Sequence, residues 1–237
     1  MPFFTKLILP DYVYHGTIAE FSKSFAKQPI NFRELGNSIN KDFGTGLYTT
    51  IDPYQATVWA KKLTKDLALE PNFINADVTP CVVAIRIKQD NYMENVEILD
   101  FRGESRLWSN FVLNHRIGSS LHNCTCAYHP QIVCGSMADN NTSGVIEEFI
   151  DQSRDTLAVE DQLWFQNRIT YKDSEKRVLT GLELGDQIAF FDEKLNKMLS
   201  VVGFCFFDKQ SEKNIVNSKN FWKEWVYHVE FNQQISI

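Results

Sequence analysis

The sequence predicts an α+β fold built from short strands and a few amphipathic helices. Short runs rich in β-branched and aromatic residues, separated by Gly, Pro and Asn, indicate the strands. Two segments with apolar residues at helical spacing, 53–63 and 106–116, indicate the helices. The 237 residues contain no internal repeat and no low-complexity segment, so we expect one compact domain over 1–237.

In the first quarter of the chain, one apolar run covers Phe3–Leu9 and another begins at Val13-Tyr14 and ends at His15-Gly16-Thr17. Residues 20–42 are polar and irregular, which predicts a loop. Residues 44–50 predict a turn that enters a short strand. Asp52-Pro53 predicts the start of a helix, because Asp is a preferred N-cap and Pro suits the first helical position.

The rest of the chain continues the same alternation. Residues 70–79 predict a loop, and residues 193–199 a short helix. Strands are predicted at 81–87, 97–101, 131–135, 187–191, 201–207 and 225–231.

The bulk composition limits the partners and the compartment. A formal net charge of −6 disfavours a duplex nucleic-acid partner, because an acidic surface repels phosphates. Five cysteines at irregular spacing favour reduced cytosolic thiols over a disulfide framework. No run is long enough for a membrane span, and the N-terminus does not have the pattern of a signal peptide. We therefore expect no membrane partner and a cytoplasmic location in the producing cell.

Three local motifs stand out. They are Tyr14-His15-Gly16-Thr17, then DFGTGLYTT at 42–50 followed by Ala56, Trp59 and Ala60, and finally DQIAFF at 186–191. Each alone has an ordinary explanation: a histidine at a strand end, a glycine turn, core aromatics, or a polar residue on the outer face of a strand. The Gly-Thr-Gly is too short for a dinucleotide fingerprint and enters a strand rather than a helix, which argues against a Rossmann fold.

Together and in this order, the motifs resemble the ADP-ribosyltransferase superfamily, in the branch with a His-Tyr-Glu signature. Within it the pattern looks most like a bacterial family of uncharacterised domains. FVLNHR at 111–116, QIVCGSMAD at 131–139 and the segment 186–199 fit the later marks of that family. The resemblance covers about 10–203 and leaves 204–237 as a C-terminal extension. It implies a split β-sheet core, in which two small antiparallel sheets form an NAD cleft with flanking helices.

The resemblance implies a role for each matching residue. His15 and Thr17 would bond the adenosine ribose, and the Gly16 backbone would pair with the nicotinamide carboxamide. Tyr48 would stack on the nicotinamide ring, and Trp59 would close an aromatic sandwich around the cationic pyridinium. The implied NAD-binding residues are His15, Gly16, Thr17, Gly46, Tyr48, Thr49, Trp59 and Arg33.

Four positions depart from this pattern or have competing explanations. Ala56 stands where relatives carry a small hydroxyl residue that bonds the carboxamide. Gln187 takes the place of the superfamily glutamate, so it can keep a hydrogen bond but neither the charge nor general-base action. With His15 and Tyr48 it completes the implied catalytic set. Arg33 and Arg116 are candidates for the pyrophosphate, and a solvated surface arginine is an equal alternative for each.

The implied function is a mono-ADP-ribosyltransferase that uses NAD⁺ as substrate, transfers ADP-ribose to a protein and releases nicotinamide. Such domains often serve as bacterial toxins or effectors, so the acceptor is expected in a host or competitor cell, reached by a dedicated secretion system. A nucleic-acid acceptor is disfavoured. The alternatives are an NAD⁺ glycohydrolase and a catalytically weak module that binds NAD⁺ or ADP-ribose.

Two further features of the sequence, a cluster of His and Cys and a set of C-terminal aromatic residues, are best explained by roles in the structure. Residues 122–129 hold two histidines and two cysteines, but their spacing matches no common zinc module, so no metal is expected. The aromatic residues of the C-terminal extension favour completion of a sheet over a surface for a protein target.

Overall fold

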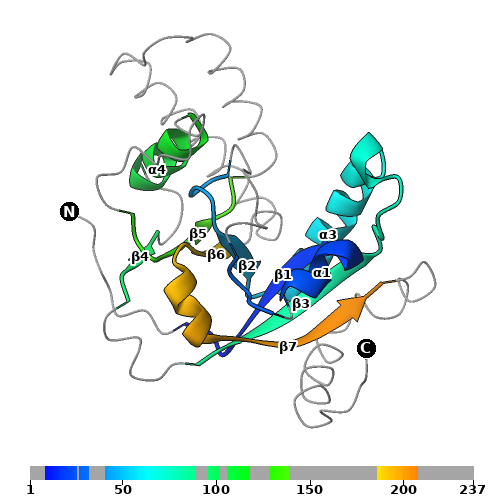
Figure 1. The fold of residues 1–237 in the computed structure, drawn as a ribbon. Helices are drawn as coiled ribbons and strands as arrows, with labels where there is room; N and C mark the ends of the chain where they lie inside the picture. The colour runs from blue at the N-terminus through cyan, green and yellow to red at the C-terminus, as the bar shows by residue number, and fades with distance from the viewer. Residues whose placement is uncertain are drawn as a thin grey trace. The chain divides into compact units, whose positions relative to one another are not determined.

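The computed structural model describes residues 9–25, 27–31, 41–88, 96–101, 106–117, 129–138 and 186–207. In these ranges helices and strands are mixed along the chain, which confirms the predicted α+β class (Figure 1). The predicted strand at 225–231 lies outside the described residues, as do Arg33, Asp139 and most of the 122–129 motif.

The chain divides into two compact units, each assembled from three separate stretches. The first unit comprises Met1–Leu7, Leu35–Leu47 and Val96–Asp192. The second unit comprises Ile8–Glu34, Tyr48–Asn95 and Glu193–Ile237.

The sheet of the second unit is antiparallel. Strand β1 (Tyr12–Ile18) lies between β2 (Leu47–Thr50) and β3 (Pro80–Ile87). Strand β7 (Leu199–Phe206) pairs with the other edge of β3. These strands confirm the ones predicted from residues 13–17, 44–50, 81–87 and 201–207. Strand β1 continues through Ile18, beyond the predicted end at Thr17.

Two helices of the second unit lie beside β1 and β3: α1 (Ala19–Phe25) and α3 (Pro53–Leu67) (Figure 1). Helix α3 begins as predicted, with the Asp52 side chain accepting a hydrogen bond from the Tyr54 backbone N–H at 3.0 Å. A short 3₁₀ turn, η1 (Pro71–Phe73), interrupts the loop predicted at 70–79.

The loop predicted at 20–42 is wrong over its first residues, because α1 forms there. The helix buries Ala19, Ser22 and Phe25, which stand three residues apart on one face. The Ser22 hydroxyl donates to the Ala19 carbonyl at 2.8 Å, so the polar member of that face has a local partner. Tertiary burial of a weakly patterned segment therefore produces this helix.

The core between helix and sheet in the second unit is small and mixed. It joins buried side chains of β1, α3, β3 and the end of β7, namely Tyr14, Ala56, Val82, Ala84, Cys205 and Phe207. Burial raises the pKa of the Cys81 and Cys205 thiols to about 12. Both cysteines are free and buried, as expected for reduced thiols that act as small hydrophobes.

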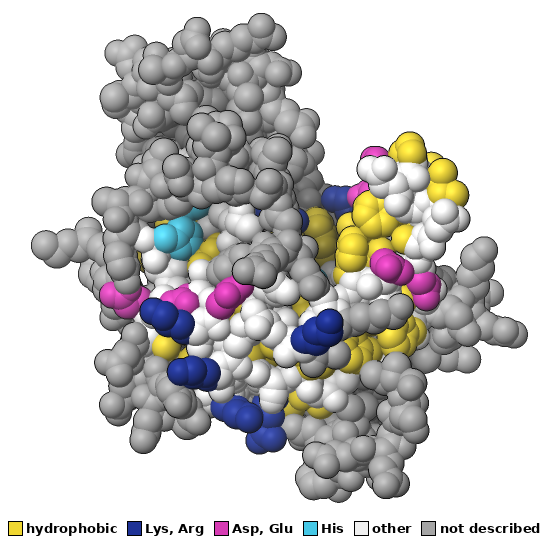
Figure 2. All heavy atoms as spheres, viewed as in Figure 1, with side chains coloured by type: hydrophobic (Ala, Val, Ile, Leu, Met, Phe, Trp, Pro, Cys, Tyr) yellow, Lys and Arg dark blue, Asp and Glu magenta, His cyan; other side chains and the backbone are white. Residues whose placement is uncertain are grey.

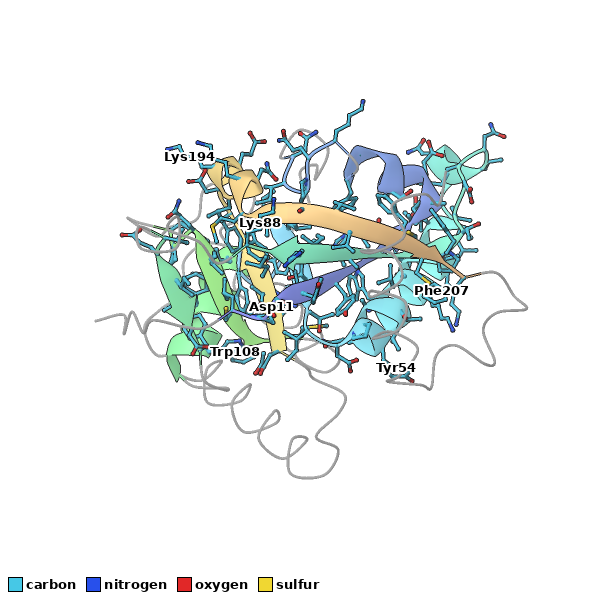
Figure 3. The ribbon with its side chains drawn as sticks, turned by 90° about the horizontal axis from the view of Figure 1, so that it is seen from below. Asp11, Tyr54, Lys88, Trp108, Lys194 and Phe207 are labelled. Atoms are coloured by element: carbon cyan, nitrogen blue, oxygen red, sulfur yellow. The ribbon has the colours of Figure 1, made fainter. Side chains whose placement is uncertain are left out.

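Helix α3 also has an outward apolar side. It buries Ala56, Thr57 and Ala60 and leaves Tyr54 and Val58 about half exposed. Figure 2 shows exposed hydrophobic side chains over the part of the molecule that holds α1, α3 and η1. The Tyr54 side chain lies on the outer side of α3 (Figure 3).

The first unit contains β4 (Ile98–Asp100), helix α4 (Arg106–Ile117), β5 (Ile132–Ser136) and β6 (Asp186–Phe190). Strand β4 runs parallel to β5, and β5 runs antiparallel to β6. Trp108, labelled in Figure 3, is buried. It ties α4 to β5, since its indole N–H donates to the Ser136 carbonyl at 3.0 Å.

The described strands follow one hydrogen-bonded order, β4-β5-β6-β2-β1-β3-β7. The parallel pairing of β4 with β5 differs from the two small antiparallel sheets that the resemblance implies. The parallel pair arises because α4 connects β4 to β5, and a helical crossover returns the chain in the same direction. A 3₁₀ helix, η4 (Glu193–Lys197), takes the place of the short helix predicted at 193–199.

Within the described residues, no helix combines the length and the apolar character needed to cross a membrane.

Candidate functional site

His15 lies at the middle of β1, opposite Val83 of β3, with its ring half-buried. Its Nδ1 lies 2.6 Å from the backbone carbonyl oxygen of Tyr48 on β2. Because a carbonyl oxygen can only accept, Nδ1 must carry the proton. In the neutral imidazole this assigns acceptor character to Nε2. The ring of Phe25 packs against the imidazole at 4.9 Å and helps to fix its plane.

The structure therefore brings the His15 imidazole and the Tyr48 backbone together. The link uses the Tyr48 backbone carbonyl, and Tyr48 is half-buried. The neighbouring candidates Thr17 and Thr49 are buried, at 2% and 3% exposure. Their side chains thus have little surface for a ligand in this conformation.

Gly16 has a packing reason for being glycine. A Cβ at this position would lie 2.1 Å from the Ala56 carbonyl oxygen and 2.9 Å from the Ala60 backbone nitrogen. Helix α3 therefore touches β1 with its backbone, which also explains the two small alanines at i and i+4 on this side of the helix. Ala56, which the resemblance places where a hydroxyl residue would bond the carboxamide, is buried in the core.

Trp59 is half-buried on α3, in the same unit as His15 and Tyr48. The Lys62 ammonium lies over the indole ring, 5.1 Å from its centroid. A cation–π contact of this kind is the interaction that the resemblance assigns to the nicotinamide pyridinium. In this structure the protein supplies that cation itself.

Gly44 and Gly46 shape the loop before β2 in the first unit. Gly44 has a backbone φ of +99°, a left-handed conformation that residues other than glycine rarely adopt. A Cβ at Gly46 would lie 2.7 Å from the Phe191 ring. The resemblance implies that Gly46 contacts NAD⁺, but Phe191 fills the space beside it.

Gln187 lies on β6 in the first unit and is 6% exposed. Its Nε2 donates to Asp42 Oδ2 at 2.8 Å and approaches the Ser136 carbonyl at 3.4 Å. The resemblance implies that Gln187 contacts a ribose directly, and here its amide nitrogen is engaged by protein acceptors.

Asp42 is the centre of a buried polar network. Its Oδ1 accepts from Arg116 Nε at 2.8 Å and also from Arg116 Nη2. Its Oδ2 accepts from the Ala138 backbone N–H at 2.9 Å, in addition to Gln187. The Asp42 and Arg116 side chains are only 10% and 11% exposed. Charge-assisted hydrogen bonds are the strong class, and breaking a buried ion pair costs about 3–5 kcal/mol.

This network changes the interpretation of Arg116. The sequence leaves it as either a pyrophosphate ligand or a solvated arginine, and neither matches its surroundings. Arg116 pairs with Asp42 and also donates to the Ala138 carbonyl at 2.6 Å. It is a buried structural cation that joins α4 to the end of the segment after β5.

Sequence reasoning gave no role to Asp42, although it opens the second motif. The sequence did contain a signal. Asp42, Arg116 and Gln187 each lie in a segment that carries the resemblance, and they supply a carboxylate, a guanidinium and an amide. Without the fold, however, 145 residues separate Asp42 from Gln187, and nothing in the spacing pairs them.

A second cluster in the first unit surrounds Gly44 with His115, His129 and Phe111. The two imidazole rings stand 5.1 Å apart, and Phe111 packs on His115 at 4.0 Å. The His115 Nδ1–H donates to the Phe111 carbonyl at 2.6 Å. Burial lowers the pKa of His115 to about 4, although the Phe111 carbonyl opposes this shift, and His129 adds a smaller lowering. His115 is therefore neutral at physiological pH and belongs to the core.

Among the described residues, no three His, Cys, Asp or Glu side chains are grouped so that they could hold a metal ion.

The chain belongs to a protein family, since residues 12–201 match the model of a family described as protein of unknown function (DUF3990). The match runs from the first residue of β1 into β7, so it covers His15, Tyr48, Asp42, Arg116 and Gln187. No curated protein and no solved structure matches the chain.

Proposed function

We propose that this chain is an NAD⁺-dependent mono-ADP-ribosyltransferase, with a variant of the ADP-ribosyltransferase fold and a protein as acceptor. The observation that carries the proposal is the His15–Tyr48 pair. The first and second motifs meet on neighbouring strands of one unit, and the Tyr48 carbonyl fixes the imidazole through Nδ1. An isolated core histidine would not explain why it meets the tyrosine of the second motif.

In the proposed reaction, the bond between the nicotinamide nitrogen and C1′ of its ribose breaks, and nicotinamide leaves with the bonding electrons. A nucleophile on the acceptor forms the new bond to C1′ and loses its proton to solvent. The protein mainly has to hold the dinucleotide in an extended, polarised conformation. His15 supports this with Nε2, which accepts from a hydroxyl of the adenosine ribose.

Stacking on the nicotinamide ring is assigned mainly to Tyr48. The Lys62 ammonium over Trp59 competes with a second cation at that indole, because like charges repel in a site of low dielectric. Trp59 therefore has a smaller part here than the resemblance alone implies.

Gln187 supports transfer of a single ADP-ribose rather than elongation of a polymer. Its neutral amide can accept a hydrogen bond from the nicotinamide ribose but cannot activate a further hydroxyl as a base. The same neutrality, with the amide nitrogen held by Asp42, supports a second candidate, a module that binds NAD⁺ or ADP-ribose with slow or no turnover. Water as the acceptor would give a glycohydrolase.

Incubation of the purified chain with NAD⁺ labelled in the adenosine part, with and without lysates of candidate target cells, separates these functions. Label on a discrete protein band is the expected result. Free ADP-ribose without a labelled band would identify a glycohydrolase. Measurable NAD⁺ affinity without either product would identify a binding module, and no affinity at all would reject every one of the three.

Substitution of the paired residues tests the site itself. His15→Ala and Tyr48→Ala are each expected to reduce NAD⁺ turnover on the order of 100-fold, because both residues position the substrate. Tyr54→Ala is the matched control, since Tyr54 is an exposed tyrosine of the same unit, and its turnover should equal that of the wild type. Full activity in both site variants, with their folds intact by circular dichroism, would refute the assignment.

A further inference from the structure

We propose that Asp42 is a positioning residue that holds the Gln187 carboxamide with Oε1 as its acceptor end. The inference rests on the proposed function, in which Gln187 accepts a hydrogen bond from the nicotinamide ribose. The proposal gives Asp42 a role in the site. It also explains why this chain carries glutamine at position 187, where the resemblance implies glutamate.

The orientation of the amide follows from the chemistry of its neighbours. The groups around Gln187 Nε2 are the Asp42 carboxylate and the Ser136 carbonyl, and both can only accept. Only the NH₂ end of the carboxamide can face them. The oxygen Oε1 is thereby fixed as the end that accepts, which is the capability that a glutamate carboxylate contributes in relatives.

The Asp42 carboxylate is itself held firmly. Arg116 binds Oδ1 through two nitrogens, and the Ala138 N–H binds Oδ2 beside Gln187. The anchor therefore connects the loop before β2, helix α4, the segment after β5 and strand β6. A side chain tied into four segments loses little further freedom when a ligand binds.

Charge balance then makes glutamine the fitting residue. Asp42 and Arg116 neutralise each other in a nearly dry environment. A glutamate at position 187 would set a second carboxylate within hydrogen-bond distance of Asp42, with one guanidinium for both. Two carboxylates in such contact cannot both stay ionised without separating, so the side chain would turn away or take up a proton.

A reciprocal exchange of the two side chains tests the proposal. In the double variant Asp42→Asn/Gln187→Glu, the new amide at position 42 can donate to the new carboxylate at position 187, so the pair keeps its net charge with donor and acceptor reversed. The Ala138 N–H would then face a donor, so recovery is expected to be partial. The readouts are kcat and KM for nicotinamide release from NAD⁺, measured at a temperature where each variant is folded.

We expect Gln187→Glu alone to lower kcat on the order of 100-fold with little change in KM, because the acceptor is displaced rather than the binding surface. The double variant should regain about tenfold in kcat over Gln187→Glu, as coupled residues of one network do. An active Gln187→Glu enzyme, or a double variant that folds like the wild type yet gains nothing, would overturn the proposal.

A matched control exists in the same unit. Gln131 Nε2 donates to Asp192 Oδ2 at 2.8 Å, which is a second glutamine–aspartate pair outside the network. Gln131→Glu makes the same chemical change against a carboxylate and should leave kcat unchanged. A loss of kcat equal to that of Gln187→Glu would show that the effect is a general loss of stability and would overturn the positioning role.

One measurement does not depend on turnover. In the wild type, the side-chain NH₂ of Gln187, assigned by its absence from the NMR spectrum of Gln187→Glu, should exchange slowly with solvent. Exchange as fast as that of free glutamine would overturn the inference even in an active enzyme. A wild type that releases no nicotinamide but keeps a protected amide would instead refute the proposed function and leave the Asp42–Gln187 anchor standing.

Discussion

Gln187 shows, at the scale of a residue, how a neighbour decides the chemistry of a site. Judged alone, glutamine in place of glutamate is a loss of charge and of basicity. Beside Asp42 it is the residue that lets a buried Asp42–Arg116 pair remain neutral while a hydrogen-bond acceptor stays in place. In the proposed site, Gln187 is therefore one half of an Asp–Gln pair.

His115 leads to a prediction about pH at the same scale. Its pKa of about 4 in the folded chain lies below the ordinary value of 6.5. Between these pH values the unfolded chain binds more protons than the folded chain does. The contribution of His115 to stability is therefore fully present above this window and is lost as the pH falls through it. From pH 7 to pH 5 the folded state should lose about 2 kcal/mol from this group.

Urea unfolding at the two pH values checks the effect of His115. His115→Gln should remove about 2 kcal/mol of the pH-dependent difference, whatever its own stability. His15→Gln serves as the control, because it retains His115 and should therefore retain the drop. An equal drop in the wild type and in His115→Gln would contradict the prediction.

At the scale of elements, the contact between α3 and β1 sets the geometry of the second unit. Its helix approaches the strand with backbone against backbone at Gly16, and the small Ala56 and Ala60 permit that distance. The same strand presents His15, one residue before the contact. The packing of α3 thus fixes the position of β1, the strand that carries the candidate histidine His15.

Gly16→Ala should therefore destabilise the chain by about 3 kcal/mol, because the added methyl group meets backbone atoms that cannot move aside. The measurement is the free energy of unfolding in urea. Val58→Ala on the exposed side of α3 is the control and should change that energy by less than about 0.5 kcal/mol. A Gly16→Ala variant as stable as the control would show that the helix can shift away.

At the scale of the whole molecule, two compact units are interleaved in sequence, each from three stretches of chain. The candidate residues are divided between them, with His15 and Tyr48 in the second unit and Gln187 in the first. A ligand that binds only the folded chain stabilises it by mass action, in proportion to the logarithm of its concentration over Kd.

NAD⁺ at about 100 times its Kd should add about 2.7 kcal/mol and raise Tm by roughly 5–10 °C in a chain of this size. Thermal unfolding monitored by circular dichroism, with and without NAD⁺, checks this. Gln131→Glu should show the same increase as the wild type, whereas His15→Ala should show none. A wild-type Tm that does not respond to millimolar NAD⁺ would contradict NAD⁺ binding.

Local signals in the sequence were sufficient for most elements. The Asp52-Pro53 cap, the apolar spacing of α4 and the β-branched runs of β3 and β5 depend on residues near one another, so a pattern of a few positions determines them. Helix α1 was not predicted from its sequence pattern, because its buried face includes a serine and its stability comes from packing on the neighbouring strands.

The sequence by itself determined the α+β class and the strands that carry His15, Tyr48 and Gln187. Only the tertiary structure decided that β4 and β5 run parallel, that Arg116 is a buried partner of Asp42, and that Gln187 is its amide donor. The physical reason is range. Propensities and caps act over a few residues, whereas burial of a charge and the balance of charges around it depend on segments that meet only after folding.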